Sequence, residues 1–566
     1  MSQPDASTPA TRRATAALFY HPEGFNAARA QVKGRHAAGA GFLKGFVESI
    51  GVEPFHCFTN NRAHYDDFRQ RTAALKGAPC ETRWHNAGNL GSLAEPGCLY
   101  LPGPGLAEAA WHRRVVDERA YSLCGVTHTV SSERAMEAIG AFLTAPVQEW
   151  DALICTTNSV RAAVEELLDG YAGYLEERVG AKPKRNAQLP VIPLGVDCDG
   201  FTRGPAEDEA GRALRARLGM ADGDVAGLFL GRLVFHAKAH PVPMFMAFER
   251  AQARLGPGRK LHLMLVGQFP NSGIEREFHD AVPRFCPSVA VHILDGADPA
   301  LARASWFAAD LFCSLSDNIQ ESFGLTPVEA MAAGLPCVVS DWDGYRETVV
   351  DGETGFTIPT VAPPPLAGGD LSDRFLLELD NYDHFIGAAC LATAVDIDAC
   401  ADAVARLAAD DGLRRRMGAA GRRRALDVFD WRHVIGAYQQ LWAELAERRH
   451  AAPQTAPRRA GEPASPLRAD PFTMFRRHPT RLIGGEDVMR LAGADAAKRL
   501  ETVLTGTLNR FGGATTVPPE GIRALIAELA AGPKRVGELL SNHPLPVRRR
   551  LIRTFAWLKK YGLVDF

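Results

Sequence analysis

The chain has 566 residues, too many for one compact core, so two or three domains are expected. Its apolar share of 46% and charged share of 23% are those of an ordinary globular protein, which excludes fibrous and low-complexity classes. The formal net charge of -2 excludes a polyanion-binding surface over the whole molecule, so any anion site must be local.

The first residues in chain order, 1–14, are polar and predict a disordered tail. Short apolar runs separated by helical stretches follow, a pattern typical of a doubly wound parallel sheet. The predicted strands of this half are residues 16–20, 98–101, 123–127 and 152–155, with a helix around 41–46. We therefore predict a Rossmann-like domain over residues 15–200.

A second series of apolar runs predicts another α/β domain over residues 201–447. Its predicted strands are residues 227–230, 261–266, 289–294, 311–314 and 337–340. Ligands of open α/β sheets bind at the carboxyl ends of the strands. Two such domains in tandem therefore predict a ligand-binding cleft between them.

Three later segments break this rhythm. Residues 359–393 open with Pro-rich and Gly-rich sequence, and we interpret them as an insertion. Residues 448–470 are rich in Ala, Pro and Arg and predict a linker. Residues 471–566 then predict a separate, mainly helical module.

The segment from Asp317 to Gly334 has the residues of a loop that leads into a helix. Thr326 fits an N-cap, Pro327 the first helical position, and Gly334 the C-terminal stop. Backbone N–H groups near residues 323–326 would then lie at a helix N-terminus, which binds phosphate without a Lys or Arg.

Glu321 and Glu329 lie on either side of this predicted anion site. A carboxylate accepts two hydrogen bonds from vicinal hydroxyls, so each glutamate can hold one sugar ring, a ribose or a hexose. Structural interpretations stay open at this point. Thr326 to Glu329 also spells a helix-capping box, and Glu321 alone has the pattern of a solvated loop acid.

Two cations follow the predicted strand at residues 227–230. Arg232 comes at its carboxyl end, and Lys238 follows six residues later. Two positive charges here can neutralise a diphosphate leaving group as its negative charge grows. Taken alone, ordinary surface charges would give the same pattern.

Together these segments resemble the GT-B family of retaining glycosyltransferases (glycosyltransferase group 1), which contains bacterial mannosyltransferases, sucrose synthases and relatives of glycogen synthase. The resemblance covers about residues 15–445 and is strongest over 190–360. Leu194 stands where the family commonly has Asn. The matching segments are residues 192–197, 231–238, 321–329, 334–341, 344–347 and 351–356.

This resemblance implies a role for each candidate residue. Arg232 and Lys238 would contact the donor diphosphate, together with backbone N–H groups of residues 323–325. Glu329 would hold the ribose, and Glu321 would lie against the transferred sugar.

Weaker matches imply that the base meets backbone near Leu294, that His128 lies near the sugar, and that Gly39 belongs to a loop, residues 34–41, near the phosphates. The predicted catalytic residues are His128, Arg232, Lys238 and Glu321. The predicted donor-binding residues are Gly39, Gly231, Leu294, Phe323, Gly324, Leu325, Thr326 and Glu329.

Asp341-Trp342-Asp343 has the spelling of a metal-binding DxD pair. We interpret it as a turn, because Arg232 and Lys238 already supply the positive charge and the pair follows a different strand. We expect no metal and no cofactor, only a nucleotide-sugar co-substrate of the UDP or GDP type.

The C-terminal module has helical patterns at residues 521–532, 536–540 and 546–561, and residues 562–566 resemble the start of a wing. The layout is similar to a winged-helix domain. Its third helix carries Arg548, Arg549, Arg550, Arg553, Lys559 and Lys560. A protein partner or self-association is favoured over nucleic acid.

We therefore predict a retaining glycosyltransferase that moves a sugar from a nucleotide-diphosphate-sugar to a hydroxyl acceptor on a glycan, lipid or small molecule. The alternatives are a catalytically weak GT-B scaffold or regulatory protein, and a GT-B epimerase or phosphorylase. The eleven unpatterned cysteines and the lack of a signal-type or membrane-spanning segment predict a cytoplasmic protein. Peripheral membrane contact through Lys33, Arg35 and Lys44 stays open.

Overall fold

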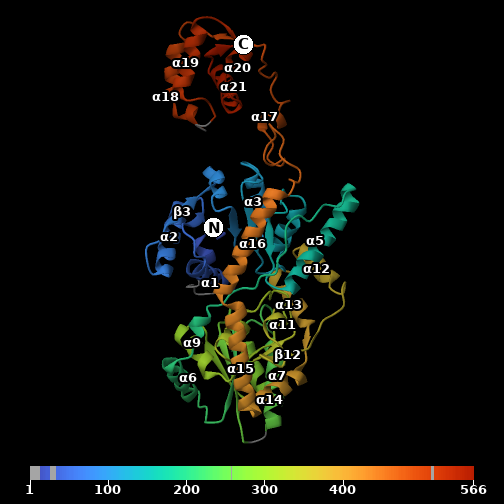
Figure 1. The fold of residues 1–566 in the computed structure, drawn as a ribbon. Helices are drawn as coiled ribbons and strands as arrows, with labels where there is room; N and C mark the ends of the chain where they lie inside the picture. Colours follow the sequence, from blue (N-terminus) through green and yellow to red (C-terminus); the bar gives the residue numbers. More distant parts are fainter. Residues whose placement is uncertain (1–12, 26–33, 256–257, 512–514) are drawn as a thin grey trace, which may run out of the picture. The chain divides into compact units, whose positions relative to one another are not determined.

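The structure is a computed structural model that describes residues 13–25, 34–255, 258–511 and 515–566. It divides into two compact units, Met1–Ser465 and Pro466–Phe566 (Figure 1). The first unit contains both α/β domains, and the second contains the C-terminal module.

The N-terminal domain is built on a six-stranded parallel sheet of order β3-β2-β1-β4-β5-β6. Its strands are β1 (Ala17–Phe19), β2 (Phe55–Phe58), β3 (Thr82–His85), β4 (Cys98–Leu101), β5 (Ser122–Val126) and β6 (Ala152–Ile154). Its helices are α1 (Gly34–Ser49), α2 (Arg62–Lys76), α3 (Leu106–Arg113), α4 (Glu133–Gly140) and α5 (Asn158–Val179), with the 3-10 segments η1 (Pro22–Phe25), η2 (Ala87–Ala94) and η3 (Ala141–Leu143). Strands β4, β5 and β6 are buried along their whole length, as expected when helices cover both faces of a parallel sheet.

The second domain repeats this design with a parallel sheet of order β12-β11-β10-β7-β8-β9. Its strands are β7 (Val225–Leu230), β8 (Leu261–Gly267), β9 (Ala290–Asp295), β10 (Leu311–Ser314), β11 (Cys337–Ser340) and β12 (Gly355–Ile358). Its helices are α6 (Pro205–Arg217), α7 (Pro241–Leu255), α8 (Ser272–Phe285), α9 (Pro299–Ala308), α10 (Leu325–Ala332), α11 (Tyr345–Thr348), α14 (Ile397–Ala409) and α15 (Asp411–Arg424), with η4 (Cys198–Phe201) before them and the π-helical segment η5 (Ala425–Phe429) after them. When each domain's strands are counted from one to six, both sheets have the order 3-2-1-4-5-6 of a dinucleotide-binding fold.

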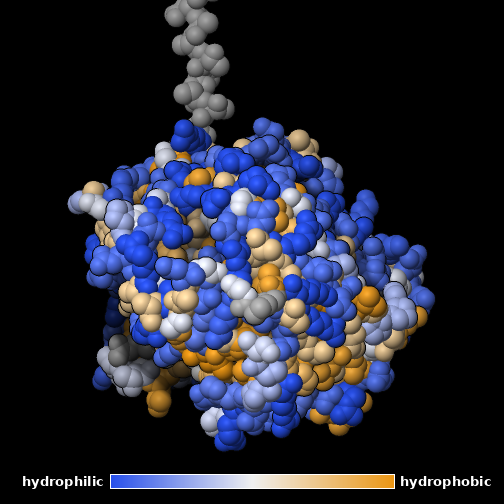
Figure 2. Space-filling view, turned by 90° about the horizontal axis from the view of Figure 1, so that it is seen from below, coloured by the Kyte–Doolittle hydropathy of each residue, from blue (hydrophilic) through white to orange (hydrophobic). Residues whose placement is uncertain are grey.

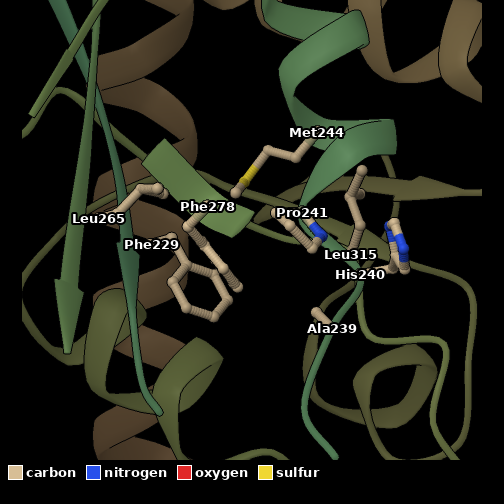
Figure 3. Close-up of a pocket in the computed structure, with 8 residues that line it drawn as sticks. All are labelled: Phe229, Ala239, His240, Pro241, Met244, Leu265, Phe278 and Leu315. Atoms are coloured by element: carbon tan, nitrogen blue, oxygen red, sulfur yellow. The ribbon is translucent and has the colours of Figure 1, made fainter. Parts of the chain in front are cut away.

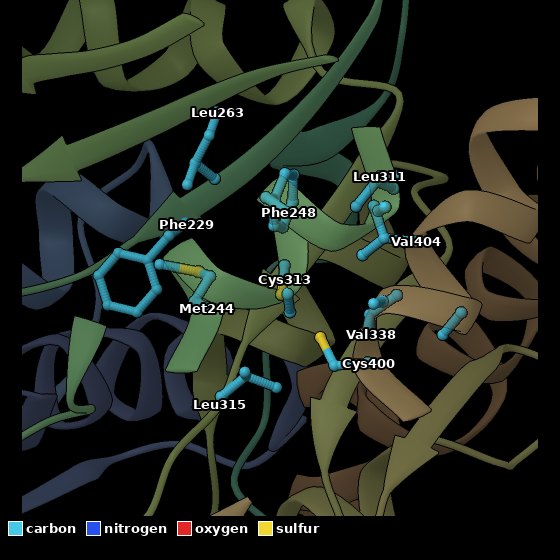
Figure 4. Packing of buried hydrophobic residues seen from close by; sticks show 14 of the residues in the cluster. Phe229, Met244, Phe248, Leu263, Leu311, Cys313, Leu315, Val338, Cys400 and Val404 are labelled. Carbon is cyan, nitrogen blue, oxygen red and sulfur yellow. The ribbon is translucent and has the colours of Figure 1, made fainter. Parts of the chain in front are cut away.

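The core of the second domain lies on both faces of its sheet. On one face, Phe229 and Leu263 of the sheet pack with Phe248 of α7 and Val404 of α14 (Figure 4). On the other face, Leu228 and other strand residues pack against α9 and α10. The predicted fold class, two doubly wound domains, is therefore confirmed.

All nine predicted strands are present, but β2, β3 and β12 were not predicted. Strand β2 carries His56, and β3 has the sequence Thr-Arg-Trp-His, so neither is a continuous apolar run. Strand β12 begins at Gly355 against the carbonyl of Cys337, where a Cβ would overlap the neighbouring backbone. The close approach of β11 to β12 therefore requires a glycine at position 355, and no apolar pattern in the sequence indicates the strand.

Helix α16 (Trp431–Ala451) returns to the N-terminal domain after the second sheet is complete (Figure 1). Tyr438 and Trp442 lie in the same buried cluster as Phe42 and Phe46 of α1. The predicted boundary at residue 447 therefore differs from the packing, because α16 completes the first domain's core.

The predicted linker, residues 448–470, also begins inside α16. Arg449 is buried and donates hydrogen bonds to the carbonyl of Gly97 at 2.6 Å and to Ser122 Oγ at 2.7 Å. Thr455 N donates to Gln148 Oε1 at 2.9 Å. The first part of this segment is thus fixed to the N-terminal domain.

The predicted insertion, residues 359–393, lies outside the second sheet. It contains β13 (Thr360–Val361), α12 (Gly369–Leu376) and α13 (Tyr382–Leu391), and β13 pairs antiparallel with β14 (Ala394–Val395). Helix α12 has no buried residue, whereas Ile386 of α13 packs against Val234 and Ala237. Helix α13 therefore covers the segment that joins Arg232 to Lys238.

The second unit has its own small sheet and its own core. It comprises α17 (Pro471–Met474), β15 (Val488–Leu491), α18 (Ala496–Thr505), η6 (Thr507–Arg510), α19 (Pro519–Ala530), β16 (Lys534–Arg535), α20 (Val536–Ser541), α21 (Leu545–Lys560) and β17 (Val564–Asp565). The strands form an antiparallel sheet of order β16-β15-β17 over a core that includes Leu525 and Phe555. The three predicted helices are present, but β17 pairs with β15 rather than with a second wing strand.

In the described part of the chain, none of the helices is long and apolar enough to cross a bilayer. The face in Figure 2 is largely hydrophilic and is interrupted by areas of hydrophobic residues.

Candidate donor site

The two groups of predicted site residues meet at one edge of the second sheet. Strands β7 and β10 are neighbours in the sheet although they are not consecutive in the chain, so the crossover direction reverses between them. Gly231 and Arg232 follow β7, and the loop from Leu315 to Gly324 follows β10. This is the switch point at which open α/β sheets bind ligands.

The central contact of the site is an ion pair between Lys238 and Glu321. Lys238 Nζ lies 2.5 Å from Glu321 Oε2, and the two side chains are only 21% and 13% exposed. Burial disfavours both charges, but the attraction between them outweighs it, so the pKa of Lys238 is raised and the pKa of Glu321 is lowered. Both groups are therefore charged at neutral pH.

Gly231 lies beside this pair, since a Cβ on it would come 3.5 Å from Lys238 Cε. A larger residue at 231 would therefore contact the lysine side chain. The backbone at this position can approach a ligand closely because it carries no side chain.

Arg232 is the first member of a chain of hydrogen bonds that reaches the other domain. Its Nη2 donates to Gln320 Oε1 at 3.2 Å, and Gln320 Nε2 donates to Tyr382 Oη at 3.2 Å. Tyr382 Oη lies 2.9 Å from Ser131 Oγ of the N-terminal domain. Tyr382 belongs to the insertion, so a segment outside the sheet connects a predicted catalytic cation to the facing domain.

The start of helix α10 differs from the predicted cap. Gly324 is the N-cap, with φ of 87°, and the helix begins at Leu325. Thr326 and Pro327 are therefore its second and third residues, and the capping-box interpretation of Thr326 and Glu329 is wrong. A glycine is needed at 324 because a Cβ there would overlap the ring of Tyr345.

This helix start leaves backbone donors at the site. The first N–H groups of an α-helix have no intrahelical acceptor, and here they include those of Leu325 and Thr326. Phe323 precedes them and is buried against Phe429. The result is a helix N-terminus suited to a phosphate group and positioned by a buried aromatic residue.

Glu329 lies in the second turn of α10 and is only partly exposed. Burial raises its pKa to about 7, although the charge of Lys238 opposes this shift. Unlike Glu321, Glu329 therefore titrates near neutral pH.

Residues of the N-terminal domain contact the loop that carries Glu321. Thr156 Oγ1 donates to the carbonyl of Ser322 at 2.9 Å, and Ser322 Oγ donates to the carbonyl of His128. The backbone of His128, which follows β5, is thereby held next to Glu321. Glu347 accepts a hydrogen bond from Asn158 N at 2.8 Å, at the N-terminus of α5, and links the domains again.

Asp343 was predicted only as part of a turn, and it also lies near the site. It has a positive φ of 43°, and its Oδ1 accepts a hydrogen bond from Thr157 Oγ1 at 3.3 Å. Burial, and then the charge of Glu321, raise its pKa to about 7. Asp341 instead pairs with Arg346 at 3.0 Å, so the two aspartates of the DxD spelling have different partners. The sequence carries no signal for the Asp343 contact beyond its position after a strand.

One expectation about the N-terminal domain is wrong. Gly39 lies within helix α1, which begins at Gly34, and not in a loop. Its lack of a side chain lets α1 pack on the carbonyl of Gly24. Lys44, considered for lipid contact, pairs with Asp197 at 2.5 Å, and its side chain is 37% exposed, so lipid contact stays untested. Lys33 lies outside the described residues.

Leu294 is the penultimate residue of β9 and is partly buried against the core of the second domain. It lies at the same carboxyl edge of the sheet as Arg232. The contact of a nucleotide base with the backbone near Leu294 stays a prediction.

A small pocket next to the site has a different character. Phe229, Leu265, Met244, Phe278 and Leu315 line it, together with Ala239, His240 and Pro241 (Figure 3). Its walls are apolar except for His240, whose pKa is lowered by burial. Such a lining does not suit a diphosphate, so we do not include it in the donor site.

Comparison with known proteins agrees with this architecture. Residues 215–368 match the family model of "Glycosyl transferases group 1". A D-inositol 3-phosphate glycosyltransferase of Xylanimonas cellulosilytica is 29% identical over 309 residues, which are 53% of this chain and 58% of that protein. A phosphatidyl-myo-inositol mannosyltransferase of Mycobacterium tuberculosis is 39% identical over 193 residues, which are 34% of this chain and 44% of that protein.

A crystal structure of a glycosyltransferase from Rickettsia africae ESF-5 has a TM-score of 0.50 and 13% identity, covering 76% of this chain and 98% of that chain. At this identity the likeness concerns the fold. The two Rossmann-like domains give the chain the GT-B fold. The chain spans about half the length of the curated relatives it matches.

Proposed function

We propose that this chain is a retaining glycosyltransferase that moves a sugar from a nucleotide-diphosphate-sugar to a hydroxyl acceptor. The observation that carries the proposal is the partly buried Lys238–Glu321 pair beside the N-terminus of α10, at the switch point of the second sheet. The relatives named for glycosyl and mannosyl transfer support the same class of reaction.

The leaving group of such a reaction is a nucleoside diphosphate, which gains negative charge as the glycosidic bond breaks. In our proposal, the N–H groups of Leu325 and Thr326 bind one phosphate, and Lys238 and Arg232 stabilise the growing charge. Lys238 is suited to this task because Glu321 holds its ammonium group in a fixed, partly buried position before the donor arrives.

In our proposal the two glutamates bind different sugars and differ in their protonation at neutral pH. Glu321 is ionised at neutral pH and would lie against the transferred sugar, where a carboxylate accepts hydroxyl hydrogen bonds. Glu329 would hold the ribose. It must be ionised to accept two hydroxyl hydrogen bonds, and its pKa of about 7 makes this contact dependent on pH.

Retention follows in the proposal from a reaction on one face of the sugar. The departing phosphate oxygen takes the proton of the acceptor hydroxyl while the new bond forms on the side from which the diphosphate leaves. The backbone of His128 and the Ser131–Tyr382 contact bring the N-terminal domain to this place, and that domain would carry the acceptor. Closure of the domains would exclude water from the reaction.

A screen of nucleotide sugars tests the proposal. UDP- and GDP-sugars are compared by thermal shift, because a donor that binds only the folded state raises the melting temperature. The donors that bind are then incubated with hydroxyl acceptors, including inositol compounds because two relatives are named for them. NMR of the product should show the α-configuration of the donor. An inverted product would refute retention, and the absence of any donor binding would favour a scaffold role.

A further inference from the structure

From the geometry of His56, His85 and Glu95, we propose a second site, for a divalent transition-metal ion such as Zn²⁺, in the N-terminal domain. One ligand atom from each residue lies within 4.8 Å of the other two, and both histidines are buried. His56 Nδ1 lies 2.9 Å from His85 Nε2. The three residues come from β2, from β3 and from the segment after η2, at the edge of the first sheet.

The hydrogen bonds of His85 orient its ring for metal binding. Ser92 Oγ lies 2.8 Å from the carbonyl of Asn89 and donates to it, so it has a lone pair and no proton for His85 Nδ1, 2.7 Å away. His85 Nδ1 must then carry the proton and donate to Ser92, which leaves the lone pair on Nε2. A histidine ligand whose other nitrogen donates to a fixed acceptor is the usual arrangement in metal sites.

The two histidines share one hydrogen bond, which metal binding would replace. Without metal, His56 Nδ1 donates to His85 Nε2. With metal, both nitrogens would turn their lone pairs to the ion.

A second histidine pair in the chain lacks the third ligand that the first pair has. His262 of β8 and His292 of β9 also lie side by side on neighbouring parallel strands, with ring nitrogens 3.0 Å apart. There the carboxylate of Asp224 binds the far nitrogen of His262, at 3.2 Å, and not the space between the rings. In the first pair, a carboxylate oxygen of Glu95 lies within 4.8 Å of one ring nitrogen of each histidine. The third ligand, rather than the pair itself, makes the site.

The donor set selects the class of ion. Two imidazoles and one carboxylate suit Zn²⁺ and neighbouring transition metals better than Mg²⁺ or Ca²⁺, which prefer oxygen ligands. In a tetrahedral zinc site the ligand atoms lie about 2.0–2.2 Å from the ion, so Glu95 would have to move inward. It is able to do so because it is exposed at the surface, where Arg83 Nη1 now holds it at 2.5 Å.

Such an ion would join two neighbouring strands to the segment that follows η2. Three elements that meet only at the sheet edge would then be held by one centre. We infer a structural role, because at least β1 and β4 separate the strands that carry the two histidines from β5, which leads to His128.

Titration of ZnCl₂ into the chelator-treated full-length chain tests the site. Calorimetry should show one ion per wild-type chain. Glu95→Gln is the main variant, because Glu95 is exposed and its loss should leave the fold intact. It should weaken binding at least tenfold. Ser92→Ala should weaken it by about 10–100-fold through the loss of the hydrogen bond to His85.

Two control variants show whether binding depends on this cluster in particular. Arg83→Gln frees Glu95 and should bind Zn²⁺ at least as tightly as the wild type. His292→Asn removes the second pair and should bind normally. Substituting Co²⁺ gives a spectrum that reports the ligands, and a histidine–carboxylate site has no thiolate charge-transfer band. Absence of stoichiometric binding, equal binding by Glu95→Gln, loss in His292→Asn or a thiolate band would each overturn the proposal.

Discussion

The two α/β domains have the same strand order but very different switch points. In the second domain, the loops after β7 and β10 bring together Lys238, Glu321 and the start of α10. In the first domain, β4 is followed by Pro-Gly-Pro-Gly, which places no charged side chain between the strand and α3. A common topology thus supplies two equivalent positions, and only the residues placed there decide which one is suited to bind a charged donor.

The largest expected effect comes from removing the charged pair. Lys238→Ala and Glu321→Ala should each lower kcat by about a hundredfold or more, because charge stabilisation at the leaving group is lost. Steady-state transfer assays measure this. Lys76→Ala is the control, since Lys76 pairs with Glu53 on the surface of the first domain. Near wild-type turnover in both site variants would contradict the assignment of the pair.

The next effect concerns the two ends of helix α10. Gly324 and Gly334 both have positive φ, 87° and 80°, but only at 324 would a Cβ meet a neighbour within 4 Å, the ring of Tyr345. Gly334→Ala should lower the free energy of unfolding by about 1–2 kcal/mol from backbone strain alone. Gly324→Ala should lower it further and also weaken donor binding, because the N–H groups shift. Chemical denaturation and donor titration measure both. Equal effects of the two variants would show that the Tyr345 contact is unimportant.

A smaller effect is expected from the link between the domains. Tyr382→Phe removes the hydroxyl that contacts both Ser131 and Gln320, and it should reduce kcat/KM by about three- to tenfold. Ser131→Ala added to Tyr382→Phe should cause little further loss, because both changes break the same contact. Tyr174→Phe, on an exposed tyrosine of α5, is the control. Full additivity of the two changes would argue against a shared link.

The smallest expected effect is a pH dependence from Glu329. Its pKa of about 7 means that donor affinity should rise severalfold as pH increases through 7, when the carboxylate becomes able to accept the ribose hydroxyls. The free energy of unfolding should change in the opposite direction and fall as pH rises. A carboxyl whose folded pKa is raised stabilises the fold below its unfolded pKa of 4.5, and this contribution is lost as pH rises through about 7.

Glu329→Gln should remove the pH dependence of donor affinity and only part of the pH dependence of stability. Asp343 also has a pKa of about 7, so Asp343→Asn serves as the matched variant. Donor titrations and melting curves between pH 5 and 8 measure the two effects. If the pH dependence of donor affinity disappears in Asp343→Asn and persists in Glu329→Gln, the ribose role belongs elsewhere.

The sequence predicts the fold well where burial alone decides it. The apolar strands β4, β7 and β10 are visible because a parallel strand covered on both faces needs a continuous apolar run. Strands β2 and β3 are not visible, because His56 and His85 interrupt the apolar pattern. These two histidines can be buried because their rings contact each other, and a single strand's sequence does not report that contact.

Some residues of the candidate site could likewise be predicted from the sequence, and others could not. Glu321, Arg232 and Lys238 could be chosen from the sequence because they follow strands and match a family motif. Tyr382 and Asp343 could not, because their partners lie in the other domain and no local pattern reports such contacts. A Thr-Pro pair fits a helix start well, so the sequence predicts Thr326 as the N-cap and Pro327 as the first residue of α10. The structure begins it at Leu325, since Gly324 alone can adopt the required φ beside Tyr345.

Calorimetric titration of UDP and GDP is the most direct test of the central claim that the switch point of the second domain binds a nucleoside diphosphate. The wild-type chain and Lys76→Ala should bind one of the two nucleotides with one-to-one stoichiometry, and Lys238→Ala should bind it at least tenfold more weakly. Absence of binding of either nucleotide to the wild type, or equal affinity in Lys238→Ala, would contradict the account.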